Sequence, residues 1–279
     1  MAATDTARSP RDFASSPAPS AGRPRSFHAW LGLFWLANLA AVALAVRHHP
    51  LVAALAFVAP APWFIWQIAV PGARGLGPAA TEFATAGREV WLTIDDGPDP
   101  ATTTPMLDLL DAHRARATFF LIGVKAARHP DLVAEIIRRG HTVGNHTFTH
   151  PCFRFWCAPA ARTGAEVDAA AAALRRAGAA GVPYFRPPAG LKSLALHPQL
   201  AARGLTVVLW NIRSLDTLPF RAGTVVTRLA RKIRPGAILL LHESGPRPAH
   251  HVAILAGLLQ HLGRTGYSCV IPAPERLGR

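Results

Sequence analysis

Cysteine is scarce in this 279-residue sequence. Its three cysteines, Cys152, Cys157 and Cys269, cannot form the disulfide framework of a small secreted protein, and none has the Cys-x-x-Cys spacing of a structural zinc site. Cys152 and Cys157 could pair in an oxidising compartment, although free thiols are the simpler interpretation. The cysteines therefore leave the redox compartment open.

Acidic residues are also few, with 16 Asp and Glu against 30 Lys and Arg, which makes the net charge +14. Lysine is rare among the basic residues (Lys125, Lys192 and Lys232), and the arginines are scattered rather than clustered. No nucleic-acid-binding motif accompanies them, so we expect no nucleic-acid partner. A basic surface near anionic lipid is the better interpretation of this charge.

The N-terminal third of the chain divides by composition. Residues 1–27 are rich in Ser, Pro, Ala and Arg, and we expect them to be disordered. Residues 29–46 and 51–70 are uncharged apolar runs, each about long enough as a helix to cross the roughly 30 Å hydrocarbon core of a bilayer. A short polar break separates them. We therefore expect residues 28–70 to be a transmembrane helical hairpin that contacts lipid, and residues 71–87 to be a linker.

Two features of the apolar segment allow other topologies. Residues 43–45, Ala-Leu-Ala, resemble a signal-peptidase site, and cleavage there would leave one anchor. Pro60 and Pro62 could instead kink the second run into an interfacial helix, which would leave one span. Four arginines precede the first run and only Arg47 separates the two, so the positive-inside rule places both flanks in the cytoplasm. Two spans in the inner membrane would keep the rest of the chain cytoplasmic, and one span would place it outside.

From residue 88 onward, short apolar runs alternate with amphipathic stretches. The expected strands are residues 90–95, 117–122, 141–145, 184–186, 205–211, 237–241 and 267–271. The expected helices are residues 103–113, 130–139, 163–177, 194–203, 224–234 and 251–263. Such alternation predicts an α/β fold, a parallel sheet or barrel with covered faces.

Polar residues gather at the carboxyl ends of these expected strands, where a (β/α) barrel builds its active site. They are Asp95, Asp96, His146, Arg186, Asp216 and His242. One carboxylate and two imidazoles are the smallest protein ligand set of a catalytic metal with open positions. His146 and His150 are four residues apart, so on one helical turn their imidazoles would face the same side. The second carboxylate is then free to act as a base, which points to metal-assisted hydrolysis.

Five motifs occur in order in this part of the chain. They are Thr-Ile-Asp-Asp-Gly-Pro (93–98), His-Thr-Phe-Thr-His (146–150), Arg-Pro-Pro-Ala-Gly (186–190), Ser-Leu-Asp (214–216) and Leu-Leu-Leu-His (239–242). Together they resemble the motifs of the polysaccharide deacetylase family, the NodB-homology domain of carbohydrate esterase family four. The resemblance covers about residues 88–272, within an expected catalytic domain of residues 88–279. It implies a distorted, incomplete (β/α) barrel with about seven parallel strands.

The resemblance also implies roles for the residues of the first three motifs. Asp96, His146 and His150 would hold a divalent metal, Zn²⁺ being the expected ion. Asp95 would be the catalytic base that takes a proton from the attacking water. Arg186 would pair with Asp95 and keep it ionised and oriented.

The remaining motifs would supply the acid. His242 would protonate the leaving amine, and Asp216 would favour the protonated form of His242. The backbone N–H of Ala189 would help to hold the oxyanion. The family usually has an aromatic residue at position 189 and Trp after the aspartate of the fourth motif, where this chain has Thr217. Both departures remove an aromatic side chain from the wall of the expected substrate site. They therefore affect which substrate the site accepts more than which reaction it performs.

A cluster of aromatic residues could replace that wall. It consists of Phe148, Phe153, Phe155 and Trp156. These rings could stack on a sugar ring or a lipid, or they could form a plain hydrophobic cap over the barrel.

The implied function is removal of the N-acetyl, or a related N-acyl, group from an amino sugar in a polysaccharide or a lipid-linked glycan. A non-catalytic, membrane-anchored carbohydrate-binding protein on the same barrel is the alternative. A different hydrolase, such as a phosphoesterase, is a third hypothesis. The sequence contains neither a Gly-x-Ser-x-Gly elbow nor a phosphate-cradling glycine loop.

Overall fold

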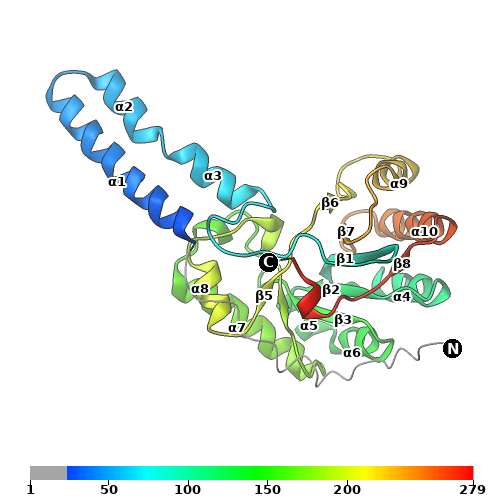
Figure 1. Ribbon diagram of the computed structural model, residues 1–279. Helices are drawn as coiled ribbons and strands as arrows, with labels where there is room; N and C mark the ends of the chain where they lie inside the picture. The colour runs from blue at the N-terminus through cyan, green and yellow to red at the C-terminus, as the bar shows by residue number, and fades with distance from the viewer. Residues whose placement is uncertain (1–23, 279) are drawn as a thin grey trace.

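A curled sheet of parallel strands forms the centre of the protein in the computed structural model, which describes residues 24–278 (Figure 1). Seven strands lie in the order β5-β4-β3-β2-β1-β7-β6, and β8 pairs with the beginning of β1. The bounds are β1 Glu89–Gly97, β2 Ala117–Leu121, β3 Thr142–Asn145, β4 Tyr184–Phe185, β5 Thr206–Val207, β6 Ile212–Arg213, β7 Ala237–His242 and β8 Ser268–Cys269. The pairings are parallel, so the predicted distorted, incomplete (β/α) barrel is confirmed.

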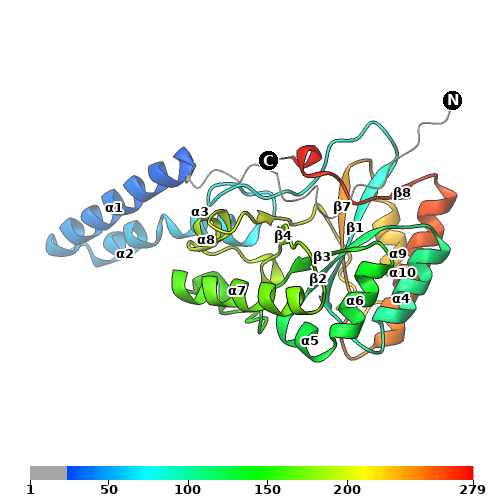
Figure 2. The same ribbon diagram turned by 90° about the horizontal axis from the view of Figure 1, so that it is seen from below.

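Helices cover the outside of the curled sheet (Figure 2). They are α4 Thr103–Ala112, α5 Gly123–Arg128, α6 Pro130–Arg138, α7 Ala160–Arg176, α8 Leu196–Ala201, α9 Ala222–Ala230 and α10 Pro248–Arg264. Short 3-10 turns are η2 Phe155–Cys157, η3 Pro188–Gly190 and η4 Pro274–Arg276. The six predicted helices are present with shifted ends. Helix α5 is not predicted, because one and a half turns are too short to show a helical period.

The alternation of side chains along β1 separates two apolar clusters. Leu92 and Ile94 pack in the cluster that joins the sheet to the outer helices, whereas Trp91 packs in the cluster inside the barrel. Successive strand residues point to opposite faces. Thr93 and Asp95 therefore share the inner face with Trp91, and this places Asp95 inside the barrel.

The chain near residues 205–211 differs from the predicted single strand. It contains two short strands, β5 paired with β4 and β6 paired with β7. Between them, the N–H of Val208 donates to the Phe185 carbonyl (2.9 Å), and the N–H of Asn211 donates to the Ile238 carbonyl (3.3 Å). One stretch of chain thus bridges the two edges of the curled sheet. The apolar pattern does not reveal this change of partner, because both halves are buried.

The N-terminal helices α1 Arg25–Val46, α2 Pro50–Val58 and α3 Ala61–Ala69 form a hairpin that projects from the barrel (Figure 1). The two arms are long and apolar enough to cross a membrane by length and composition. The second arm is broken between α2 and α3, where Pro60 and Pro62 lack backbone N–H groups. At the base of the hairpin, Trp30 stacks on Trp63 and Phe64, both at 5.2 Å between ring centroids.

Two predicted segment boundaries are wrong. Helix α1 begins at Arg25, so the expected disorder of residues 1–27 does not hold for its last three residues, and residues 1–23 lie outside the described part of the chain. Residues 71–87 do not form a free linker. Ala80 and Phe83 are buried and make bridges to the barrel, because this segment carries apolar side chains among its glycines and prolines.

Lys192 joins the hairpin to the loop that follows β4. Its buried ammonium donates to the carbonyls of Val70 (2.9 Å) and Ala73 (2.5 Å), and its own N–H donates to the Ile68 carbonyl (3.2 Å). Burial lowers the pKa of Lys192 to about 8. These bonds hold the end of α3 against the loop that carries η3.

Candidate active site

The end of β1 brings two neighbouring carboxylates to one place. The strand pairing is irregular between Asp95 and Gly97, and Asp96 has a left-handed φ of 74°. As a result both carboxylates approach the same imidazole nitrogen: His146 Nε2 lies 3.8 Å from Asp95 Oδ2 and 3.4 Å from Asp96 Oδ1. This arrangement requires Asp96 to adopt a backbone conformation that is rare outside glycine.

Glycine is required at position 97 for a steric reason. A Cβ atom there would lie 1.4 Å from Oε1 of Glu243, a fully buried side chain. No side chain can occupy that space without moving Glu243. The close approach keeps the irregular end of β1 against β7.

Asp96, His146 and His150 have the geometry of a metal site. One ligand atom from each lies within 4.8 Å of the others, and among the described residues this is the one such group of His, Cys, Asp and Glu. His146 Nδ1 lies 2.7 Å from the carbonyl oxygen of Arg186. Because a carbonyl only accepts, Nδ1 carries the proton, and the lone pair of Nε2 faces Asp96. This tautomer suits a metal ligand.

His150 completes the group, with its Nε2 3.3 Å from Asp96 Oδ1. Burial, reinforced by the neighbouring His146, lowers the pKa of His150 to about 4. The imidazole is therefore neutral at pH 7 and available as a ligand. One carboxylate and two neutral imidazoles fit a zinc-type ion with open positions.

The spacing of the two histidines predicted a helical turn, but the structure has no helix at these residues. Residues 146–150 form a loop in which Thr147 and His150 have left-handed φ values of 65° and 54°. Glu166 of α7 holds this loop: its carboxylate accepts from the N–H groups of Phe148 (2.9 Å) and Thr149 (2.8 Å). The imidazoles still converge, with ring centroids 4.8 Å apart. Contacts with a residue 17 and 18 positions further along the chain therefore replace the expected helical geometry.

Arg186 lies directly after β4 and is completely buried beside Asp95. Its Nη1 donates to Asp95 Oδ1 (2.6 Å) and to Thr93 Oγ1 (2.8 Å), and its Nε donates to the Val208 carbonyl (2.9 Å). The guanidinium also lies 4.1 Å from the ring centroid of Phe120. Burial lowers the pKa of Arg186, and the charge of Asp95 opposes that shift. The pairing predicted from the sequence is present.

His242 and Asp216 form a second pair, on the β7 side. His242 Nδ1 lies 2.7 Å from Asp216 Oδ1, and the backbone N–H of His242 donates to Asp216 Oδ2 (2.8 Å). Burial alone would lower the pKa of His242, but the hydrogen bond and the charge of Asp216 outweigh it and raise that pKa. The same contacts hold the pKa of the buried Asp216 carboxyl well below its ordinary value. An imidazolium at His242 is therefore favoured.

Several residues that support the metal group are not among the predicted site residues. Lys125 Nζ (2.7 Å) and Ser244 Oγ (2.8 Å) both donate to the backbone carbonyl of Asp96. Behind them, Thr103 Oγ1 donates to Glu243 Oε2 (2.7 Å), and burial raises the pKa of Glu243 to about 8. Ser244 and Glu243 directly follow His242, so their position after a strand is the signal that could have identified them.

The predicted aromatic cluster divides in the structure. Phe155 is buried against Phe185 and belongs to the core, as a hydrophobic cap would. Phe153 is 78% exposed, and Trp156 is 39% exposed. Trp156 lines an apolar cavity of about 540 Å³ together with Phe64 of α3. The four rings therefore do not act as one wall.

Comparison with known proteins identifies relatives of the chain. A sequence model of the family described as polysaccharide deacetylase matches residues 83–208. A chitooligosaccharide deacetylase of Bradyrhizobium is 36% identical over 192 residues, which is 68% of this chain and 86% of that protein. A peptidoglycan-N-acetylglucosamine deacetylase of Bacillus cereus is 33% identical over 182 residues, which is 64% of this chain and 84% of that protein.

Solved structures agree with the sequence comparison. A family 4 carbohydrate esterase from Streptomyces lividans, solved with acetate, matches with a TM-score of 0.62 and 31% identity, and covers 69% of this chain and 96% of its own. A family 4 pseudoenzyme from Bacillus anthracis, 23% identical, shares the fold with a TM-score of 0.62 over 68% of this chain and 65% of its own. The predicted resemblance is thereby confirmed: the chain belongs to the polysaccharide deacetylase family, to which these carbohydrate deacetylases also belong.

Proposed function

We propose that the protein hydrolyses the N-acetyl, or a related N-acyl, group of an amino sugar in a polysaccharide or a lipid-linked glycan. The relatives named for chitooligosaccharide and peptidoglycan deacetylation support this substrate class. The observation that carries the proposal is the convergence of Asp96, His146 and His150 within 4.8 Å, beside the Asp95 carboxylate. This arrangement provides a metal position and an adjacent base.

The proposed metal is zinc, held by Asp96, His146 and His150, because nitrogen and oxygen ligands with open positions suit that ion. When bound, such an ion polarises an acyl carbonyl and lowers the pKa of water toward about 7. Asp95 accepts a proton from the attacking water. Arg186 holds Asp95 in place, since the pair is buried and hydrogen-bonded at 2.6 Å.

His242 is the proposed acid. Its Nδ1 proton is held by Asp216, so the Nε2 proton is the one available to the leaving nitrogen. An amide needs this proton because an amide anion is a very poor leaving group. The N–H of Ala189, in η3 after Arg186, would donate to the developing oxyanion. The non-catalytic alternative is not favoured, because none of these groups is replaced in the chain.

Replacing Asp216 with Asn should move the alkaline limb of the pH–rate profile to lower pH. Asp216 raises the pKa of His242, so the imidazolium persists to higher pH and activity is lost as the pH rises through that pKa. The neutral amide removes the negative charge, and the pKa of His242 falls. The shift is measured from initial rates of acetate release between about pH 6 and pH 10. This range begins just below the ordinary histidine pKa of about 6.5 and extends well above it. An alkaline limb at the wild-type position would argue against His242 as the acid.

The apolar hairpin is the proposed membrane anchor. Large apolar side chains on α1 and α2 are more than half exposed, among them Trp35, Leu36, Leu39, Val42 and Leu55. Water would disfavour a surface of this extent, whereas lipid would cover it. With two spans, the barrel lies on the cytoplasmic side of the inner membrane, following the arginines around the hairpin.

Alkaline carbonate extraction should leave the full chain in the membrane pellet. A C-terminal alkaline phosphatase fusion should be inactive and a fluorescent-protein fusion bright, because two spans put both ends on one side of the membrane and the arginines favour the cytoplasmic side. An active phosphatase fusion would instead indicate one span and an outward-facing barrel. Release of the protein into the carbonate supernatant would exclude the anchor.

The function is tested by incubating the purified full chain with N-acetylglucosamine oligomers and with a lipid-linked N-acetylglucosamine. Acetate is measured by a coupled assay, and the new amine is confirmed by mass spectrometry. Acetate and amine should appear in equal amounts. Release of phosphate, or of no product at all, would reject N-deacetylation.

A further inference from the structure

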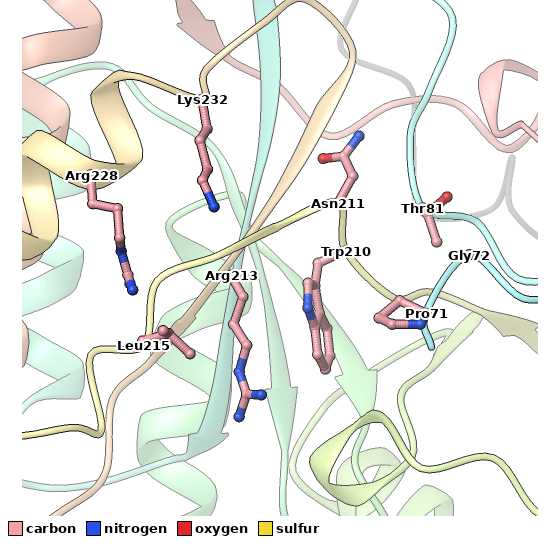
Figure 3. A pocket seen from close by; sticks show the side chains of 9 residues that line it. All are labelled: Pro71, Gly72, Thr81, Trp210, Asn211, Arg213, Leu215, Arg228 and Lys232. Carbon is pink, nitrogen blue, oxygen red and sulfur yellow. The ribbon is translucent and has the colours of Figure 1, made fainter. Parts of the chain in front are cut away.

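A pocket with three cationic side chains lies between the proposed active site and the membrane hairpin. We call it the cationic pocket and define it by Trp210, Arg213, Leu215, Arg228 and Lys232, with Pro71 and Gly72 at its edge. Its volume is about 370 Å³. Figure 3 shows Arg228 and Lys232 reaching from α9 and the turn after it toward the strand that carries Arg213.

The described part of the chain places no counter-charge at the cationic pocket. Among the described residues, Arg213, Arg228 and Lys232 form no ion pair with any carboxylate, and no acidic residue lines the pocket. Within residues 24–278 the two guanidinium groups lie over aromatic rings: Arg213 is 5.9 Å from the ring centroid of Trp210, and Arg228 is 5.8 Å from that of Phe220. Three unpaired cations around one cavity attract an anion.

Hydrogen-bond donors are also left over at this pocket. Nη2 of Arg228 and Nδ2 of Asn211, which also lines the pocket, are buried and have no acceptor among the described residues. The side-chain oxygen of Asn211 already has a partner, since Oδ1 accepts a hydrogen bond from the N–H of Ile238 (3.1 Å). Buried donors without acceptors are uncommon in proteins. What is missing at this position is therefore an acceptor, and cations together with spare donors favour phosphate oxygens.

The cationic pocket shares a wall with the proposed active site. The ring of Trp210 lies 5.5 Å from the guanidinium of Arg186, and a Cβ atom at Gly190 would lie 2.5 Å from the same ring. Leu215 directly precedes Asp216, the partner of His242. A ligand in the pocket is therefore a neighbour of the substrate site rather than a remote one.

The other side of the pocket faces the hairpin. Pro71 and Gly72 follow the end of α3, and Lys192 holds that end against the loop after β4. If α1–α3 are embedded in lipid, the cationic pocket lies at the level where phosphate groups join lipid chains to head groups. A sugar carboxylate offers one negative charge, whereas a diphosphate that links a sugar to a lipid offers two negative charges and more acceptor oxygens, which suits several cations better.

We propose that the cationic pocket binds the phosphate or diphosphate that links the amino sugar to a membrane lipid, so that the substrate is a lipid-phosphate-linked N-acyl amino sugar. This inference rests on the proposed deacetylase function. The same phosphate chemistry could come from a phospholipid head group. The experiment below distinguishes the two sources.

The first measurement compares two substrates on the full chain in phosphatidylcholine nanodiscs. One is N-acetylglucosamine joined to a short alkyl chain through a phosphodiester, and the other is the neutral alkyl glycoside of the same chain length. We expect wild type to prefer the phosphodiester in kcat/KM. In Arg213→Gln and Lys232→Gln the ratio of the two kcat/KM values should fall about 10-fold, because one charge-assisted hydrogen bond is lost.

Arg231→Gln is the matched control. Arg231 is an exposed cation at the end of α9, next to Lys232 in sequence, and it does not line the pocket. It carries the same charge change and should keep the wild-type ratio. An equal ratio in wild type and in both pocket variants, or an equal fall in Arg231→Gln, would overturn the proposal.

The second measurement does not depend on activity. Isothermal titration of the full chain with inorganic diphosphate should show binding in wild type and weaker binding in Arg213→Gln and Lys232→Gln. Diphosphate binding without any deacetylation would refute the proposed function and retain the anion site. Deacetylation without diphosphate binding would refute the site alone.

The third measurement identifies the source of the phosphate. Diphosphate titration is repeated in nanodiscs that contain phosphatidylglycerol in place of part of the phosphatidylcholine. Unchanged diphosphate affinity in the two lipids supports the substrate phosphate as the ligand. Competition by phosphatidylglycerol, abolished in Arg213→Gln, would assign the pocket to a phospholipid head group and overturn the substrate assignment.

Discussion

Asp95→Asn should lower the rate of acetate release by about 10³-fold while the metal content stays at the wild-type level, since general base catalysis contributes about 10²–10⁴-fold. The amide has nearly the shape of the carboxylate but does not accept the proton of the attacking water. Asp95 is not one of the three residues that could hold a metal ion together, which are Asp96, His146 and His150. Activity and metal binding should therefore separate in this variant.

The same substitution has a cost in stability. Arg186 is completely buried, and Asp95 is the carboxylate with which it forms an ion pair. Removing one partner of a buried ion pair leaves an uncompensated charge and typically lowers the free energy of unfolding by about 3–5 kcal/mol. Thermal unfolding in detergent must accompany the assay, so that loss of base and loss of fold are separated. Asp108→Asn, at an exposed ion pair with Arg139, is the matched control.

Activity near the wild-type level in a folded Asp95→Asn protein would reject Asp95 as the base. Loss of zinc from the variant would give a different conclusion. Asp95 would then belong to the metal group, despite the 3.8 Å between its Oδ2 and His146 Nε2. The ratio of zinc to protein, measured by plasma mass spectrometry, decides between the two.

Removal of the metal should abolish activity. EDTA followed by desalting should lower acetate release to the background, and added Zn²⁺ should restore it. His146→Ala should lower zinc affinity by more than about 100-fold, since loss of an outer partner of a ligand already costs about 10–100-fold. With two ligands left, the group no longer has the three that an open zinc site uses.

Zinc affinity can be measured by competition with a chromogenic chelator, which reports on the site without any substrate. His113→Ala is the control, because His113 is exposed and outside the metal group. His146→Ala protein that binds zinc as tightly as wild type would contradict the assigned ligand set. Full activity after EDTA treatment, with no metal detected, would contradict metal dependence altogether.

Local sequence was sufficient to identify the candidate residues of the site. Asp95, Asp96, His146 and His150 were identifiable because carboxylates and imidazoles follow apolar strands, and the barrel topology brings such strand ends together. The structure does bring them together, although their roles stay predictions. The two apolar helical arms were equally readable, since each long uncharged run is apolar enough to form a helix of membrane-spanning length.

The shape of the site depended on contacts that no local pattern contains. The loop of His146 and His150 is held by Glu166 on α7, so its backbone does not follow the helical spacing of the two residues. Similarly, Asp96 has its left-handed conformation at the point where the pairing of β1 with β2 becomes irregular, while the pairing of β1 with β7 stays regular up to Asp95. Propensity is a local property, and these constraints come from partners far along the chain.

The sequence by itself determined which groups are available, namely two long apolar runs, two adjacent carboxylates and a histidine pair. It also determined the family to which the chain belongs. Only the tertiary structure decided that the strand predicted at 205–211 changes partner and that Arg213, Arg228 and Lys232 meet around one cavity beside the hairpin. The physical reason is that composition and period report on each segment alone. Which segments become neighbours is settled by the packing of the whole barrel, where contacts distant in sequence outweigh local preference.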